Sequence, residues 1–162
     1  MKKIDLKKTK EFWNNNIFLI LSLIPLFLII LFQPQQNTLF PIFFGDESIA
    51  LFDLWSIQHF LSGVLIISFF LLPKNTVGEI KNWQKIIPFI LFVALSWEAM
   101  EIYFETGVII KGWTGSEHWS NRIITDPLMA LLGGVVGYIT KDSWRVAIVP
   151  AIFWLILKIF LI

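Results

Sequence analysis

The chain has 162 residues and a net charge of +1; 56% of its residues are hydrophobic and 15% are charged. An average soluble domain carries about 25% charged residues, so this balance argues against a soluble domain and is typical of a chain that crosses a bilayer several times. The sequence contains no cysteine, which excludes disulfides, thiolate metal sites and cysteine nucleophiles.

Five apolar segments follow one another along the chain. Each has roughly the 17 to 25 residues that are needed to cross a hydrocarbon core about 30 Å thick. They cover residues 16–32, 48–72, 86–104, 123–140 and 146–162. No small-residue cleavage site follows the first segment, so we expect a retained helix rather than a signal peptide. The sequence therefore predicts an all-α fold in which residues 1–162 form one membrane domain, a polytopic bundle of about five transmembrane helices.

Basic residues are unevenly distributed among the loops between these segments. Several lysines precede the first segment, and the loops after the second and fourth segments carry further basic residues, whereas the opposite side has only Lys111 and Arg122. Cytoplasmic loops of membrane proteins collect lysine and arginine. We therefore expect a cytoplasmic N-terminus and an external C-terminus.

Ionisable residues inside the spans are costly, by roughly 2.5 to 3.5 kcal/mol each near a helix centre. Five of them fall in the outer half of the second, third and fourth segments, and Arg122 directly precedes the fourth. The six residues are Asp53, His59, Glu98, Glu101, Arg122 and Asp126. The basic residues of the loops give the orientation of the chain in the membrane. The segment limits give the depth of each ionisable residue, at about 1.5 Å per residue. Because both place the six residues at similar depth on one side, the pattern indicates a shared site.

The residue types suggest distinct roles within this site. We expect His59, Glu98, Glu101 and Asp126 to be catalytic, as acid–base groups. Arg122 can pair with Glu98, Glu101 or Asp126, because a guanidinium fits carboxylates well. We expect Arg122, which can also hold an anionic head group, and Asp53 to bind substrate.

Structural roles for the same residues stay open. His59 can be a packing histidine bonded to a neighbouring helix, and the glutamates of the third segment can form an ion pair with Arg122. Asp53 lies close enough to the interface to be solvated. We expect Glu117 and His118, in the outer loop, to be solvated, with a role in covering the site as the alternative.

Metal binding is a further alternative, because imidazole and carboxylates are acceptable ligands for zinc, manganese or iron. The Glu-x-x-Glu spacing of Glu98 and Glu101 lacks the Glu-x-x-His of di-iron bundles, and Arg122 nearby would oppose a cation. We therefore expect no metal and no cofactor.

Small residues accompany the polar ones. Gly133 and Gly137 form a GxxxG pair in the fourth segment, and Gly63 follows His59 by one turn in the second. Such glycines let another helix backbone approach closely, so we expect them to serve packing and to help bring the polar helix faces together.

The chain from about Asp53 to Tyr138 resembles the VanZ-like family of small bacterial membrane proteins. The resemblance is carried by Asp53, by His59-Phe60 with Gly63, by Trp97-Glu98-Ala99-Met100-Glu101, and by Arg122, Asp126 and the glycine-rich run at 132–137. It implies a multi-pass protein of the bacterial inner (plasma) membrane, part of the cell envelope, with a site at His59, Glu98, Arg122 and Asp126. The member that names the family is associated with resistance to teicoplanin-type antibiotics, and no chemistry is settled for the family.

These observations favour a site that acts on or binds a lipid-type amphiphile, such as a lipid-linked envelope precursor. One alternative is a non-catalytic accessory subunit of a membrane protein complex. A second is a proton or ion relay, since intramembrane carboxylates and histidine can carry protons. The expected partners are membrane lipids, with a membrane complex or a homo-oligomer as options, and no nucleic acid.

Overall fold

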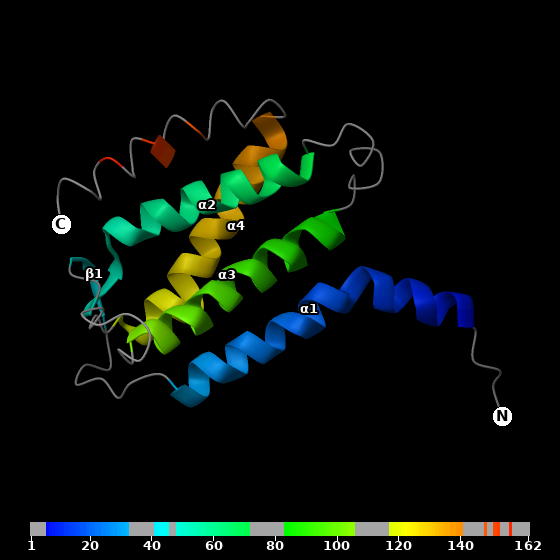
Figure 1. Ribbon diagram of the computed structural model, residues 1–162, viewed down its shortest axis with the longest axis horizontal. Helices are drawn as coiled ribbons and strands as arrows, with labels where there is room; N and C mark the ends of the chain where they lie inside the picture. The colour runs from blue at the N-terminus through cyan, green and yellow to red at the C-terminus, as the bar shows by residue number, and fades with distance from the viewer. Residues whose placement is uncertain are drawn as a thin grey trace.

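The computed structural model describes residues 6–32, 41–45, 48–71, 83–105 and 117–140, and the single residues 148, 151, 152 and 156. Within these ranges the protein is mostly helical (Figure 1). The elements in chain order are α1 (Leu6–Phe32), β1 (Ile42–Phe44), β2 (Ala50–Phe52), α2 (Leu54–Leu71), α3 (Trp83–Glu105), the π-helical turn η1 (Asn121–Thr125) and α4 (Asp126–Thr140).

Two helical stretches are long and apolar enough to cross a membrane. They are Lys85–Glu105 in α3 and Asn121–Thr140 in η1 and α4, and they contain the third and fourth predicted spans. Shorter apolar stretches, Asn16–Phe32 in α1 and Trp55–Ile67 in α2, lie within the first and second predicted spans. The fifth predicted span, 146–162, lies outside the described residues except at four helical positions, so it stays a prediction.

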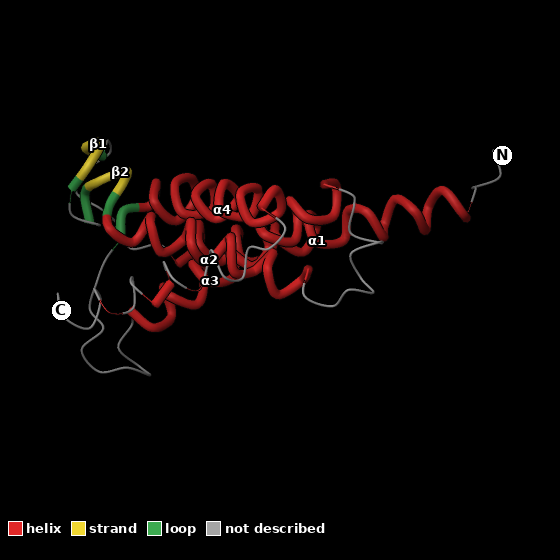
Figure 2. Tube along the Cα trace, turned by 90° about the horizontal axis from the view of Figure 1, so that it is seen from above, coloured by secondary structure: helices red, strands yellow, loops and turns green. Residues whose placement is uncertain are grey.

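The prediction of an all-α chain is wrong between β1 and α2. The predicted second span begins at residue 48, whereas residues 50–52 form β2, which pairs in parallel with β1. Figure 2 shows this small sheet at the end of the helices opposite the N-terminus. The strand sequences Ile-Phe-Phe and Ala-Leu-Phe contain residues that favour extended backbone. The helix starts only after Asp53, whose carboxylate accepts a hydrogen bond from the Ser56 backbone N–H at 2.9 Å and so acts as its N-cap.

The helices make unequal contacts with one another. The closest pairs are α2 with α4 and α1 with α3, and α4 also packs against α3, whereas α2 and α3 touch each other little. Because α2 and α3 each pack against α4 but touch each other little, space remains between α2 and α3. This arrangement matters for the hollow described below.

Glycines explain the close approach of α2 and α4. A Cβ on Gly63 would lie 1.9 Å from the carbonyl oxygen of Ala130, and one on Gly133 would lie 1.8 Å from the carbonyl oxygen of Phe60. No side chain can be placed at such distances without separating the helices. The prediction that these glycines let another helix backbone approach closely is confirmed.

Large apolar side chains lie on the outside of the bundle, and charged side chains lie inside it beside the apolar core. The outward faces of α1 and α4 expose large apolar side chains, including Phe27 and Ile139. Several of the largest fully buried side chains are charged: Arg122, Glu98 and Asp126. Charged residues are almost never fully buried unless they are paired, so the interior of this bundle must be understood through its ionisable groups.

Candidate functional site

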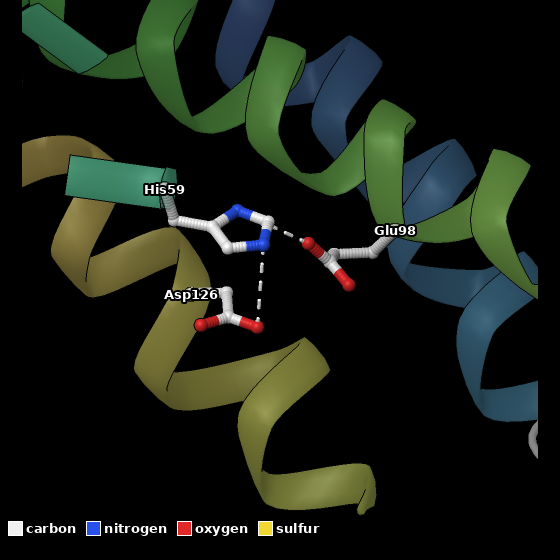
Figure 3. Close-up of side chains that lie close together, drawn as sticks. All are labelled: His59, Glu98 and Asp126. Carbon is white, nitrogen blue, oxygen red and sulfur yellow. Dashed lines mark ion pairs between the residues drawn. The ribbon is translucent and has the colours of Figure 1, made fainter. Parts of the chain in front are cut away.

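Three helices each contribute one ionisable side chain to the centre of the buried group (Figure 3). His59 comes from α2, Glu98 from α3 and Asp126 from α4. The Nδ1 atom of His59 lies 3.5 Å from Oε1 of Glu98, and its Nε2 atom lies 3.5 Å from Oδ2 of Asp126. Both carboxylates are fully buried, and His59 is 6% exposed. The sequence-based prediction that these three residues meet is confirmed; their chemical role stays a prediction.

The chain direction explains why they meet. The first residue of α2, the last residue of α3 and the beginning of η1 lie at the same end of the bundle (Figure 1). At 1.5 Å per residue, each of the three side chains lies roughly 8 to 11 Å inward from the helix end nearest to it. Similar depth on three neighbouring helices therefore follows from the positions of the residues in the sequence.

The imidazole of His59 has a carboxylate at each nitrogen. A neutral imidazole has only one N–H, so its second nitrogen presents a lone pair. With two ionised carboxylates, one lone pair would face a negative oxygen at 3.5 Å. The arrangement is stabilised only if a further positive charge is shared by the three groups, as a proton or as a cation.

Arg122 does not pair as the sequence predicted. Its expected partners were Glu98, Glu101 or Asp126, but its Nη2 atom donates to Oε1 of Glu105, and its Nε atom lies 3.3 Å from Oε2 of Glu117. The guanidinium is fully buried between these carboxylates. Two carboxyl groups therefore contact the guanidinium, and its Nη1 atom has no hydrogen-bond partner among the described residues. The predicted role of Arg122 in substrate binding stays a prediction.

The outer-loop residues Glu117 and His118 are not solvated as expected. Glu117 is 7% exposed and His118 is fully buried. His118 Nδ1 lies 2.7 Å from the Ser120 hydroxyl oxygen. Burial raises the pKa of Glu117 well above its ordinary value, the negative charge of Glu98 adds to this effect, and Arg122 opposes it. The loop thus closes the polar group from the end of the bundle.

A π-helical turn orients Arg122 and Asp126. The backbone N–H of Asp126 bonds to the carbonyl of Asn121, five residues earlier. Pro127 follows, and a proline has no N–H for a helical bond and its ring clashes with the carbonyl four residues before it. We attribute the wider turn to Pro127. Single π-helical turns occur frequently at functional sites, and this one directs Arg122 to Glu105 and Asp126 to His59.

Asp53 lies at the edge of the group. Its Oδ1 atom caps α2 through Ser56, and its Oδ2 atom accepts a hydrogen bond from Nδ2 of Asn121 at 3.1 Å. Both carboxylate oxygens thus bind the protein, and they connect the start of α2 to η1. Its predicted role in substrate binding stays a prediction.

Two overlapping sets of side chains have the geometry to hold a metal ion. One set is His59, Glu98 and Asp126, and the other is Glu98, Glu101 and Glu117. In each set, one possible ligand atom per residue lies within 4.8 Å of the others. Glu98 belongs to both sets, and Glu101 is half-buried one turn after it on α3.

A hollow of about 180 Å³ adjoins the group, between α2 and α3. Its wall is mostly apolar, with His59, Gln58 and Ser62 as the polar positions. The lining residues are Gln58, His59, Ser62, Ile66, Val93, Ala94, Trp97 and Ala130. The hollow lies where α2 and α3 touch little, so the close pairing of α2 with α4 leaves space on the side of α3.

Sequence reasoning missed Glu105, Glu117 and Asn121 as members of the buried group. A signal for Glu105 was present, because it follows Glu101 by four residues and Glu98 by seven and so lies on the same helix face. No local pattern identifies Glu117, because it precedes η1 and lies outside the helices.

Comparisons with known proteins give no relative from which a function could be carried over. No protein-family model, no curated protein and no solved structure matches the chain. The reasoning about function therefore starts from the geometry of the site.

Proposed function

We propose that the chain is a multi-pass protein of a bacterial inner (plasma) membrane, with its N-terminal arm in the cytoplasm. Support comes from the two long apolar helices, from the apolar side chains exposed on α1 and α4, and from the burial of charged groups inside the bundle. A soluble monomer rarely exposes such extensive apolar surface. In this orientation, the polar group faces the outer leaflet, and the resemblance to the VanZ-like family agrees with a place in the cell envelope.

Within that membrane, the protein binds a lipid-type amphiphile and acts on its polar part. The observation that carries this proposal is the hollow between α2 and α3, because apolar walls and a reactive imidazole occur in one space. Ligand sites in proteins are typically apolar clefts with a few placed polar groups. Val93, Ala94 and Ile66 would contact the apolar part of the ligand, and His59 would contact its polar part.

The size of the hollow restricts what it can hold. Sites for drug-sized ligands begin at about 300 Å³, whereas this hollow has about 180 Å³. It therefore fits the junction between a chain and a head group, and the rest of the amphiphile would lie in the bilayer beside α2 and α3.

The pairing of Arg122 changes the expected head group. With Glu105 and Glu117 against it, Arg122 attracts a phosphate less strongly than an arginine without such partners would. The site is otherwise rich in carboxylates, so the polar part that fits best is neutral or cationic, such as a hydroxyl, an amide or an ammonium group.

The arrangement of polar groups favours this function over a proton relay. Among the described residues, His59 is the buried ionisable group farthest from the sheet end of the bundle. Farther along the bundle, Ile67, Ile86 and Ile90 fill the core. A relay would need groups across the whole membrane.

Photolabelling with a diazirine-bearing lipid in nanodiscs tests the proposal. We expect label on α3 peptides that contain Val93 and Trp97 in the wild type. Ser62→Phe fills the hollow and should reduce this label several-fold. Leu132→Phe adds the same ring on the exposed face of α4 and should leave the label unchanged. Equal labelling of α3 in both variants would contradict the proposal.

A further inference from the structure

The carboxylate of Glu98 is fully buried, and its surroundings supply no ordinary hydrogen bond. Neither Oε1 nor Oε2 of Glu98 has a hydrogen-bond partner among the described residues, although His59 lies 3.5 Å away. A buried polar group of this kind is costly unless something binds it. A proton on Glu98 would face the Nδ1 atom of His59 at 3.5 Å, which is longer than an ordinary hydrogen bond, whereas a metal ion would bind the oxygen directly.

The charges around Glu98 are unbalanced. The acidic side chains at this end of the bundle are Asp53, Glu98, Glu101, Glu105, Glu117 and Asp126. In the part of the chain that the structure describes, Arg122 is the one lysine or arginine near them, because the described lysines lie at the starts of α1 and α3, at the other end. Two of the carboxylates contact Arg122, whose charge also acts on Glu98 from a distance. Among the described residues, His59 is the basic group that contacts both Glu98 and Asp126.

The contacts of Arg122 remove the main objection to a cation. The sequence placed its guanidinium among Glu98, Glu101 and Asp126, where it would repel a metal ion. The structure instead holds it against Glu105 and Glu117. The second set of possible ligands includes Glu117, which contacts Arg122, whereas no ion pair joins Arg122 to Glu98 or Asp126 among the described residues.

We propose that His59, Glu98 and Asp126 bind one divalent transition-metal ion, Mn²⁺, Fe²⁺ or Zn²⁺. One imidazole nitrogen and two carboxylates suit these ions, and nitrogen ligation distinguishes them from Mg²⁺ and Ca²⁺, which prefer oxygen. Three protein ligands leave positions open for water or for an oxygen of a ligand in the adjoining hollow. Binding of the ion does not depend on the proposed function. Only the statement about an oxygen of a ligand in the hollow rests on that function.

Titration of the purified full-length chain with Mn²⁺ tests this assignment. The protein is prepared in mild detergent without a polyhistidine tag and treated with a chelator, and free Mn²⁺ is followed by electron paramagnetic resonance. We expect one saturable site per chain, from which Zn²⁺ displaces Mn²⁺ and from which about a hundredfold excess of Mg²⁺ does not. Absence of a saturable site, or displacement by Mg²⁺, would overturn the proposal.

Matched variants on α3 identify the ligand. Glu98→Gln should weaken Mn²⁺ binding by more than the roughly 10- to 100-fold that loss of a second-shell partner causes. Glu101→Gln makes the same change one turn later and should keep the site. If both variants bind as the wild type does, or if both lose the ion, the assigned ligand set is wrong.

A measurement on the folded wild type covers the case in which Glu98→Gln does not assemble. The chain has two histidines, so a nitrogen coupling in the Mn²⁺ spectrum must come from His59 or His118. We expect the coupling to persist in His118→Gln and to disappear in His59→Gln; persistence in His59→Gln or absence in the wild type would contradict the site. Neither experiment contains the labelled lipid, so its failure is distinct from failure of the proposed function.

Discussion

The two halves of the bundle differ in the side chains that lie between α2, α3 and α4, whereas α1 packs on α3 through the apolar cluster of Ile29, Leu95 and Ile102. In the half away from the sheet, Ile67, Ile86 and Ile90 form the core, and a Cβ on Gly134 would meet the Ile90 side chain at 2.2 Å. In the half near the sheet, Glu98, Arg122 and Asp126 are buried. The apolar half sets the spacing of the helices by close packing, and this spacing determines where the ionisable groups of the other half lie.

This difference separates the apolar side chains that stabilise the fold from the ionisable side chains that we propose for function. Apolar packing between glycine-faced helices is favourable in itself. Buried ionisable groups are weak contributors to stability and are costly when incompletely partnered. Changes in the two halves should therefore have different consequences, and four substitutions test this contrast.

The largest loss of stability is expected from Arg122→Met. Removing one partner of a buried ion pair costs about 3 to 5 kcal/mol, and here Glu105 and Glu117 would both lose their cation. Thermal unfolding in detergent measures the effect. A triple variant that adds Glu105→Gln and Glu117→Gln should recover most of the loss; no recovery would contradict the account of this pair.

Gly133→Ala should come next, with a loss of about 3 kcal/mol, the upper end of the usual range for overpacking. Its new methyl group would overlap the carbonyl oxygen of Phe60 and force α2 away from α4. The melting temperature gives the effect, and Val136→Ala on the exposed face of α4 is the control. A Gly133→Ala protein that melts with the control would show that the helices are not in contact there.

A smaller loss, about 1 kcal/mol, is expected from Asp53→Ala. This substitution removes the N-cap of α2 and the hydrogen bond from Asn121. Asp53→Asn keeps a capping oxygen and should lose only a few tenths of that amount. Equal melting temperatures for the two variants would mean that Asp53 does not cap the helix.

The smallest effect on stability is expected from Glu98→Gln. In metal-free protein this change removes a buried charge that has no hydrogen-bond donor among the described residues, so the melting temperature should stay the same or rise slightly. Added Mn²⁺ should then stabilise the wild type and not the variant. A large loss of stability in the metal-free variant would identify Glu98 as a structural residue instead.

The sequence predicted the features that depend on helix periodicity and on composition. It identified the helical segments of α1 to α4, the close approach at Gly63 and Gly133, and the meeting of His59, Glu98 and Asp126. Each of these follows from residue type and spacing along a helix, which are local quantities.

The features that it missed depend on local backbone irregularity or on a loop. Pro127 is visible in the sequence. The π-helical turn before it turns Arg122 away from the direction that regular α-helical spacing predicts. Glu117 and His118 are buried although they lie outside the helices, and helix periodicity does not reach them. The pairing of β1 with β2 was hidden because short apolar strands resemble the start of an apolar helix.

The most direct test of the site is an experimental structure of the full-length protein crystallised in a lipidic mesophase with Mn²⁺. The account predicts that His59, Glu98 and Asp126 converge on one anomalous peak and that lipid density enters the hollow beside Trp97. Side chains that point from the bundle toward lipid, or carboxylates too far from His59 to share an ion, would contradict it.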